Sequence, residues 1–445
     1  MPRPGVLLVN PPIHDFAAYD FWARPLGLLT LGGALRASGV AVTLLDALDP
    51  GSPWLTAKER PRRRQPGRGR FHRAPLHQVP GPIAELGRRI GRRFARYGLG
   101  PDSLVRALES ARPPDAVLLG CGMTYWYPGA LETAALVRRT WPRAPLLLGG
   151  VYATLCPAHA AACSGVDRVV PGGLDEALAA VGDTLGVKLE RDPDALPAHD
   201  LAAGVDAAAL ATSSGCPRRC AYCGVAALAP RYRARAPEHV EREARAIAAL
   251  GIRDLALYDD ALLARPERAV AILERLAPLA LRLHAASGLS CRGLTREVAR
   301  AMRRGGLCTV RLGLETADPD TQRRLGDKAS LEDLAAALRH LEQAGYERRD
   351  VGVYVMAGLP RQGLAEIEDS LERVASLGAR PHLAEYSPVP GSPLFDEACA
   401  ASPLPLAEEP LHHNPTLLPC ASFGHGDLAR IKVHSKELWR RVAKT

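Results

Sequence analysis

The chain has 445 residues, of which 47% are hydrophobic and 24% are charged, a composition typical of soluble globular proteins with two or three domains. No apolar run approaches the roughly eighteen residues that a membrane helix needs. The ten cysteines follow no regular framework and no leader pattern opens the chain, which argues against a disulfide-rich secreted protein and predicts a cytoplasmic one. The chain has 57 lysine and arginine residues and 48 acidic residues, which gives a formal charge of +9. Much of this positive charge is concentrated in one segment, described below.

Strands and helices alternate through a first predicted domain, residues 1–200. Its strands are short and uniformly apolar, as in Val6-Leu7-Leu8-Val9, which is typical of a parallel sheet covered on both faces. The sequence therefore predicts a doubly wound, Rossmann-like α/β domain that binds ligands at the carboxyl ends of its strands. No G-x-G-x-x-G motif follows the first strand, which argues against an ordinary dinucleotide-binding domain. The predicted strands are 6–9, 40–45, 115–120, 145–148 and 167–170, and the predicted helices are 26–38, 88–97 and 130–140.

A basic insertion interrupts this domain at about residues 57–100. Its segment 58–73 is dense in arginine, proline and glycine and lacks apolar periodicity. One interpretation is a nucleic-acid contact, and the other is a solvated loop. The loop is favoured, because arginine dominates lysine throughout the chain and no aromatic residues are interleaved for stacking on bases.

Three cysteines with the spacing Cys-x3-Cys-x2-Cys are the most informative motif: Cys216, Cys220 and Cys223. Four thiolates normally close an iron–sulfur cubane, so a set of three leaves one iron open to another ligand. A structural zinc site usually takes four ligands, often in two close pairs, and no second pair follows here. A disulfide with a spare thiol is disfavoured by the reduced compartment. The spacing therefore favours a cluster with an open iron.

A second predicted domain, residues 201–400, repeats β-α units of about thirty residues. Such right-handed repeats close into a barrel or partial barrel whose chemistry lies after the strands. Ser330 and Asp333 form a capping box for one of its helices. The predicted strands are 254–258, 281–285, 309–312, 351–356 and 382–386, and the predicted helices include 238–250, 266–276, 295–304 and 366–377.

Several side chains of this domain admit two interpretations. Arg311 either neutralises a carboxylate of the substrate or pairs with Glu315. Cys291 and Cys308 are hydrogen donors or ligands, or else small buried thiols, which are commoner. The other cysteines show no ligand spacing, so no second cluster is predicted: Cys121, Cys156, Cys163, Cys399 and Cys420.

The last segment, residues 401–445, is predicted as a C-terminal tail. One interpretation is a substrate lid in which His412 or His413 acts as a base. The favoured alternative is a surface helix over 427–442 that follows a loop.

The cysteine triplet resembles the signature of the radical S-adenosylmethionine superfamily and fits it without departure. The resemblance implies a partial (β/α)6 barrel and a [4Fe–4S] cluster whose unique iron chelates the amino and carboxylate groups of S-adenosylmethionine. Reductive cleavage, with electrons from a donor such as flavodoxin or ferredoxin, then yields a 5′-deoxyadenosyl radical. The implied contacts are Tyr222 next to adenine, Asp259 or Asp260 at the methionine amino group, Ser287 and Glu315 at ribose and methionine, and Gly358 in a backbone turn beside adenine.

The first domain resembles the cobalamin-binding domain of cobalamin-dependent radical S-adenosylmethionine enzymes. The motifs that carry this resemblance are Asn10-Pro11-Pro12, Pro25-Leu26-Gly27 and Gly149-Gly150. A D-x-H-x-x-G motif for a cobalt-ligating histidine is absent, which implies base-off binding without a protein histidine; Tyr152 stands where a histidine often occurs. The alternative is a flavodoxin-like domain that binds nothing. The residues implied along the nucleotide tail of the cofactor are Thr124, Gly149, Gly150 and Thr154.

These resemblances predict a cobalamin-dependent radical enzyme, a methyltransferase that acts on an unactivated carbon of a small-molecule or natural-product substrate. A first alternative is a radical enzyme that catalyses a cyclisation or rearrangement without methyl transfer. A remote alternative is an iron–sulfur sensor that binds nucleic acid through residues 58–73. No membrane partner is predicted.

Overall fold

The computed structural model describes residues 3–19, 21, 23–60, 71–76, 78–79, 81–202 and 205–444. The chain divides into two compact units. The first unit comprises residues 1–209 together with the short segments 249–252 and 408–411, and the second comprises the remainder. No helix in the described ranges is long and apolar enough to cross a membrane.

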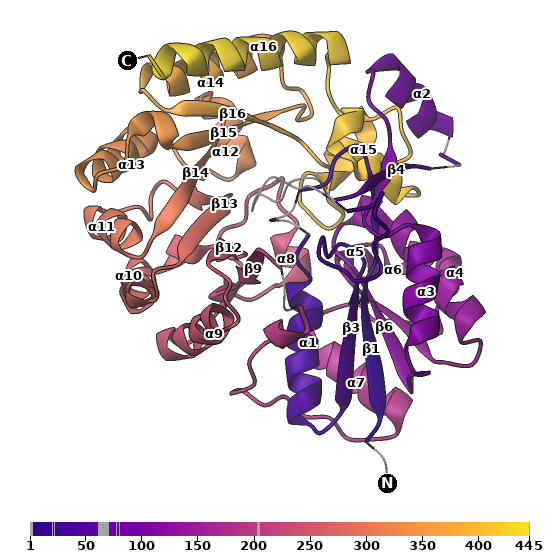
Figure 1. Ribbon diagram of the computed structural model, residues 1–445. Coiled ribbons are helices and arrows are strands. Elements are labelled where there is room, and N and C mark those ends of the chain that lie inside the picture. The colour runs from indigo at the N-terminus through magenta and orange to yellow at the C-terminus, as the bar shows by residue number, and fades with distance from the viewer. Residues whose placement is uncertain are drawn as a thin grey trace. The chain divides into compact units, whose positions relative to one another are not determined.

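The first unit contains the predicted doubly wound sheet. Its five parallel strands have the order β3-β1-β6-β7-β8, of which Figure 1 labels β3, β1 and β6. The order reverses between β1 and β6, and at such a switch point a crevice opens outside the carboxyl ends of the strands. The strands are β1 (Gly5–Asn10), β3 (Ala41–Asp46), β6 (Ala116–Cys121), β7 (Leu146–Gly150) and β8 (Arg168–Val169).

Helices cover both faces of this sheet because its strands are apolar on both sides. Helices α1 and α7 pack on one face, where Leu8 and Leu35 are fully buried. Burial of such a leucine contributes about 1.5–3 kcal/mol. Gly33 lets α1 approach the segment that follows α7, since a Cβ there would lie 2.0 Å from the Leu196 carbonyl oxygen. The helices are α1 (Leu26–Ala37), α3 (Pro101–Ser110), α4 (Tyr127–Thr140), α5 (Val151–Leu155), α6 (Pro157–Cys163) and α7 (Leu174–Leu185).

The structure corrects the prediction for the basic insertion. The helix predicted over 88–97 is wrong: α2 (Gly81–Arg89) ends there, and β5 (Ala95–Tyr97) follows. Gly91, with φ of 63°, ends the helical run in the left-handed region that favours glycine. Strand β5 pairs antiparallel with β2 (Ile13–Asp15) and β4 (Arg73–Pro75), a sheet that depends on contacts far apart in sequence. Most of the arginine-rich segment, residues 61–70, lies outside the described residues.

The second unit contains a six-stranded sheet in sequential order, β9-β12-β13-β14-β15-β16, in which β12 to β16 pair in parallel. Helices α9, α10, α11, α13 and α14 lie along its outer face (Figure 1). This is the expected β-α repeat. The strands are β9 (Ala207–Leu210), β12 (Asp254–Leu257), β13 (Arg282–Ser290), β14 (Leu307–Glu315), β15 (Gly352–Ala357) and β16 (Arg380–Glu385). The helices are α8 (Val225–Leu228), α9 (Pro237–Ala249), α10 (Pro266–Leu276), α11 (Arg296–Arg304), α12 (Pro319–Leu325), α13 (Leu331–Gln343), α14 (Leu364–Ser376), α15 (Phe395–Ala401) and α16 (His425–Val442); a two-stranded ribbon joins β10 (Ser213–Ser214) to β11 (Arg233–Ala234).

Alternation along β14 separates the two faces of this sheet. Val310, Leu312 and Leu314 are almost fully buried, as expected for side chains beneath the outer helices. Arg311 and Gly313 therefore belong to the opposite face, which is called the inner face below. The capping box at the start of α13 is confirmed, because Ser330 Oγ accepts from the N–H of Asp333 (3.1 Å) and the Asp333 carboxylate accepts from the N–H of Ser330 (2.9 Å).

The end of the chain packs on the second sheet. Helix α16 lies against β16, and Ser435 Oγ donates to the Pro381 carbonyl oxygen (3.2 Å). His412 and His413 are 7% and 1% exposed. The His413 ring lies 2.8 Å from the Leu406 carbonyl oxygen through Nε2. These contacts anchor the histidine segment, so a base role for either ring gains no support.

Candidate active site

The three cysteines lie on one loop of the second unit, between β10 and α8. None of the thiols is in a disulfide, and Cys220 is buried. The backbone around them is fixed, because the Ala221 N–H donates to the Leu325 carbonyl oxygen (3.0 Å) and the Ala221 carbonyl accepts from Leu394 (2.8 Å). The loop thus holds its shape through contacts with distant parts of the same unit.

Glycines allow the backbone to pack closely around this loop. Gly215 has φ of 73°, and a Cβ there would lie 2.5 Å from the Arg231 carbonyl oxygen. Gly326, with φ of 100°, approaches the Cys220 backbone from the end of α12. Side chains at either position would force the loop and its neighbours apart.

The donor set fits a cluster that binds three thiolates on three different irons. Burial raises the pKa of Cys220, and the Lys328 ammonium opposes that rise. A coordinating metal deprotonates a thiol outright, so a raised pKa in the free thiol does not prevent ligation. Within the described ranges no three His, Cys, Asp or Glu side chains converge on one metal ion. Three free thiols on one loop are the donor set of a cubane that leaves one iron open.

The two aspartates after β12 have different surroundings. Asp259 is buried and accepts from the Thr212 N–H (2.9 Å), from Thr212 Oγ1 (2.6 Å) and from Ser213 Oγ (2.6 Å). Asp260 is exposed, and its Oδ2 accepts from the Gly215 N–H (2.9 Å). Asp259 therefore anchors the strand that enters the cysteine loop, and Asp260 presents a carboxylate beside that loop.

A buried ion pair lies at the carboxyl end of β14. Lys328 Nζ donates to Glu315 Oε1 (2.7 Å), and the Tyr222 hydroxyl donates to the same oxygen (3.1 Å). Burial lowers the pKa of Lys328, but the Glu315 carboxylate outweighs it, and the net shift is upward. Burial, followed by the negative charge of Glu315, raises the pKa of Tyr222. The pair of Arg311 with Glu315, one of the two interpretations of Arg311, does not occur among the described residues.

Glycine and strain shape this end of β14. Glu315 has φ of 73°, a left-handed conformation that is unusual for a residue with a side chain, at a register shift in the β14–β15 pairing. A Cβ at Gly313 would lie 2.4 Å from Lys328 Nζ and 2.8 Å from Glu315 Oε1. The strained backbone thus turns the carboxylate toward Lys328 and Tyr222.

The other predicted contacts belong to the strands on either side of β14. Ser287 is exposed and lies within β13, at a register shift, and not after the strand as predicted, because β13 is longer than the predicted 281–285. Gly358, with φ of 92°, follows β15, and its N–H donates to Gln362 Oε1 (3.0 Å). Gln362 also donates to the Met356 carbonyl oxygen (3.0 Å), so this buried amide holds the turn.

In the first unit, a second set of predicted residues lies at the carboxyl edge of the sheet. Gly150 has φ of 94° and passes so close to Cys121 that a Cβ would lie 2.6 Å from its carbonyl oxygen. Thr154 Oγ1 donates to the Gly150 carbonyl (2.9 Å) and accepts from the Gly172 N–H (3.1 Å). Gly149 is half-buried beside them, and the turn that begins at Thr124 contacts α5. The four residues therefore share one edge.

Tyr152 lies behind this edge and not on it. Its side chain is fully buried, its hydroxyl lies 2.7 Å from His159 Nδ1, and its ring stacks on Tyr127 at 5.2 Å. The Tyr127 hydroxyl in turn donates to Glu409 (3.0 Å). Tyr152 is thus a packing residue in this structure.

Asn10 and Asp46 end the neighbouring strands β1 and β3. Asn10 Nδ2 donates to Asp46 Oδ1 (2.7 Å), which also accepts from the Leu48 N–H (2.9 Å). Burial raises the pKa of Asp46 to about 6 from 3.8, against the effect of these hydrogen bonds. Between about pH 4 and pH 6, Asp46 is therefore protonated in the folded chain and ionised in the unfolded chain. The stability that this proton contributes is fully present below about pH 4 and is lost as the pH rises through 6.

An Asp46→Asn variant is expected to lose this pH dependence and to be more stable at pH 8 by about 3 kcal/mol, the equivalent of a shift of about two pKa units. The amide keeps the acceptor for Asn10 and Leu48 but carries no charge. Urea unfolding at pH 5 and pH 8 measures the difference, with Glu109→Gln on the exposed face of α3 as a control. A variant no more stable than the wild type at pH 8 would contradict the raised pKa.

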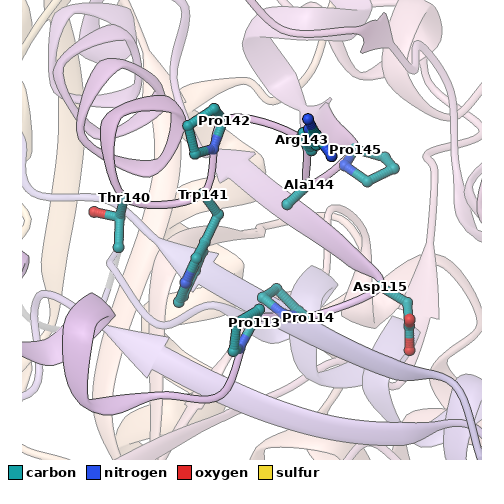
Figure 2. Close-up of a pocket in the computed structure, with 9 residues that line it drawn as sticks. All are labelled: Pro113, Pro114, Asp115, Thr140, Trp141, Pro142, Arg143, Ala144 and Pro145. Atoms are coloured by element: carbon teal, nitrogen blue, oxygen red, sulfur yellow. The ribbon is translucent and has the colours of Figure 1, made fainter.

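A cavity of about 510 Å³ opens at the opposite edge of the first sheet (Figure 2). Figure 2 shows Trp141 and the prolines before β6 and β7 around it, with Asp115 at one side. Because these residues precede the strands, the cavity lies at their amino ends. It is therefore separate from the edge that carries Gly150 and Thr154.

Sequence reasoning missed Lys328 and Gln362. Neither belongs to a motif; Lys328 reaches the site from beyond α12, and Gln362 lies in the turn just after β15. The only signal for Lys328 in the sequence was its residue type, because most cationic residues of the chain are arginines.

Comparison with known proteins agrees with this architecture. Residues 210–374 match the family model of the radical S-adenosylmethionine superfamily. An uncharacterised methyltransferase of Pyrococcus horikoshii is 25% identical over 217 residues, 46% of this chain and 46% of that protein, so the match spans less than half of the relative.

Two solved structures share the fold of nearly the whole chain. The radical S-adenosylmethionine methyltransferase TsrM from Kitasatospora setae, with tryptophan and an S-adenosylmethionine analogue bound, has a TM-score of 0.65 at 17% identity and covers 93% of this chain and 82% of its own. The cobalamin-dependent enzyme OxsB, with aqua-cobalamin bound, has a TM-score of 0.58 at 14% identity and covers 98% and 62%. Residues 210–374 thus match the radical S-adenosylmethionine superfamily, and nearly the whole chain shares the fold of TsrM and OxsB.

Proposed function

We propose that the protein is a cobalamin-dependent radical S-adenosylmethionine methyltransferase that acts on an unactivated carbon of a small molecule. When bound, a [4Fe–4S] cluster supplies the electron that splits S-adenosylmethionine into methionine and a 5′-deoxyadenosyl radical, and cobalamin supplies a methyl carrier. The observation that carries the proposal is the loop with three free thiols beside Asp260, in a domain of this superfamily.

In this proposal Cys216, Cys220 and Cys223 hold three irons of the cluster. The anchoring of Thr212 and Ser213 on Asp259 keeps the start of their loop in place. Since that carboxylate already accepts three hydrogen bonds, it is a positioning residue.

S-adenosylmethionine would contact the groups that surround this loop. Asp260 is the carboxylate for its amino group, because it is exposed and its described hydrogen bond uses only Oδ2. Glu315, held by Lys328 and Tyr222, would accept hydrogen bonds from ribose hydroxyls or the methionine amino group. Ser287 and the Gly358 turn would complete the site on the neighbouring strands.

Cobalamin would bind at the carboxyl edge of the first sheet. Gly150 is exposed there beside the half-buried Gly149, Thr154 donates to the Gly150 carbonyl, and the buried Thr124 begins the turn that contacts α5. The fold shared with OxsB, which was solved with aqua-cobalamin, supports this assignment. Tryptophan bound to TsrM supports a small-molecule substrate. An electron donor such as flavodoxin or ferredoxin is part of the proposal.

Product analysis tests the proposed reaction. Anaerobically reconstituted protein with dithionite, cobalamin and S-adenosylmethionine is expected to form both 5′-deoxyadenosine and S-adenosylhomocysteine, because the second product marks methyl donation. Omission of cobalamin should remove S-adenosylhomocysteine alone. Formation of 5′-deoxyadenosine without S-adenosylhomocysteine in the complete mixture would replace the proposal with a cyclisation or rearrangement.

A further inference from the structure

Arg311 carries a positive charge on the inner face of the second sheet, four residues before Glu315 along β14. Its side chain is half-buried, and its described hydrogen bond runs from Nη1 to the Val310 carbonyl oxygen (2.9 Å). Burial lowers its pKa, but a guanidinium remains protonated at any physiological pH. No carboxylate among the described residues forms an ion pair with it.

This isolation is unusual within the chain. Arg235 reaches the fully buried Glu243 (2.5 Å), and the buried Arg96 pairs with Glu132. Half-buried Arg268 and Arg380 also form no ion pair with a carboxylate of the described residues, but Arg268 donates to the Thr212 and Arg235 carbonyl oxygens and Arg380 stacks on Trp439. The described hydrogen bond of Arg311, in contrast, goes only to the Val310 carbonyl. Glu315 does not serve Arg311, since it is bound by Lys328 and Tyr222.

His382 on β16 brings a second unsatisfied group to the same place. Its Nε2 is buried and has no hydrogen-bond partner within the described part of the chain. Burial, with the positive charges of Arg311 and Arg380, lowers the pKa of His382 to about 3, so the ring is neutral at pH 7. A neutral imidazole with the proton on Nε2 is a hydrogen-bond donor without an acceptor. Tyr354 lies edge-on to this ring at 6.1 Å.

Gly352 on β15 lets Arg311 and His382 approach each other. A Cβ at this position would lie 2.6 Å from Arg311 Cδ and 2.6 Å from His382 Cδ2. The two side chains therefore flank the glycine on the same face, with Tyr354 two residues further along β15. Arg311 can only donate, and His382 Nε2 donates in the tautomer that carries its proton there, so an acceptor with negative charge would serve both groups.

We propose that Arg311 and His382, beside Tyr354, bind a carboxylate of the substrate. This inference rests on the proposed function and adds a substrate class, a small carboxylic acid. The planar guanidinium donates to both carboxylate oxygens, and His382 Nε2–H donates to one of them. The carboxylate of S-adenosylmethionine is a poorer occupant, because Arg311 lies roughly 13 Å before Glu315 along the strand, whereas the other proposed contacts to S-adenosylmethionine lie at the strand ends or in the register-shifted part of β13.

The test uses acetate as the probe and acetamide as its uncharged isostere. The full chain with an oxidised cluster is labelled with ¹³C at histidine Cε1, and the His382 signal is assigned with His382→Gln. Acetate is expected to shift this signal saturably and acetamide to leave it unchanged. Arg311→Gln should weaken the acetate response at least tenfold, Arg311→Lys should weaken it less because the positive charge remains without the two-pronged geometry, and the surface variant Arg253→Gln should match the wild type.

Each contrary result has a definite meaning. An acetate response that is absent, that acetamide reproduces or that survives in Arg311→Gln would overturn the carboxylate site. The affinity for S-adenosylmethionine is measured with the same variants and is expected to stay within twofold. A tenfold loss in Arg311→Gln would assign the carboxylate to S-adenosylmethionine and overturn the substrate assignment. Because these measurements need no turnover, failure to form 5′-deoxyadenosine would count against the proposed function alone.

Discussion

The Cys220→Ala variant is expected to form no detectable 5′-deoxyadenosine from S-adenosylmethionine and dithionite. Cys220 is the middle ligand of the proposed cluster and the most buried of the three cysteines, at 8% exposure. Two thiolates from the loop leave two irons without a protein ligand, so the cluster is not retained. Iron and sulfide analysis of the reconstituted protein, with chromatography of the nucleoside product, measures both effects.

Cys420→Ala is the matched control for this experiment. Cys420 is also buried, at 4% exposure, and packs in an apolar cluster of the same unit with Leu359 and Tyr386. Its loss should cost a little stability and leave iron content and cleavage unchanged. Cleavage by Cys220→Ala at more than a few per cent of the wild-type rate would remove the cysteine loop from the mechanism.

Replacement of Glu315 by Gln is expected to lower stability by about 3 kcal/mol, because it leaves the Lys328 ammonium buried without its counter-charge. The side chains of Glu315 and Lys328 are 9% and 19% exposed, so solvent screens the pair only weakly. Cleavage of S-adenosylmethionine should fall about 100-fold, the size of effect that a misplaced ligand produces. Urea unfolding and the initial rate of 5′-deoxyadenosine formation provide the two measurements.

The double variant Glu315→Gln with Lys328→Met separates the two effects. Removal of both charges should restore most of the stability, since no unpaired charge then remains buried. Cleavage should stay low, because the carboxylate that contacts S-adenosylmethionine is still missing. Recovery of cleavage together with stability would instead show that Glu315 only supports the fold.

The parts of the fold that were predictable are those that local sequence determines. The strand Val6-Leu7-Leu8-Val9 is apolar at every position because helices cover both faces of its sheet. The cap of α13 joins residues three apart. The cysteine loop could be located in the same way, because the spacing of its three cysteines lies within one short segment.

The parts that were missed depend on contacts between distant segments. Residues 88–97 contain a helical pattern, but the pairing of β5 with β2, more than eighty positions earlier, overrides it. Lys328 reaches Glu315 only because α12 and the segment after it fold back over the end of β14. Ser287 was placed after its strand because the length of β13 depends on its pairing with β14.

The hydrogen bonds that fix the cysteine loop involve only protein atoms. Asp259, Asp260, Leu325 and Leu394 hold it through groups that do not depend on iron. Because these bonds need no iron, we expect the loop to keep its shape in the metal-free protein, unlike zinc fingers, whose polypeptide folds only around the ion. A cluster destroyed by oxygen is then expected to be rebuilt on the folded polypeptide, without a cycle of denaturation and renaturation.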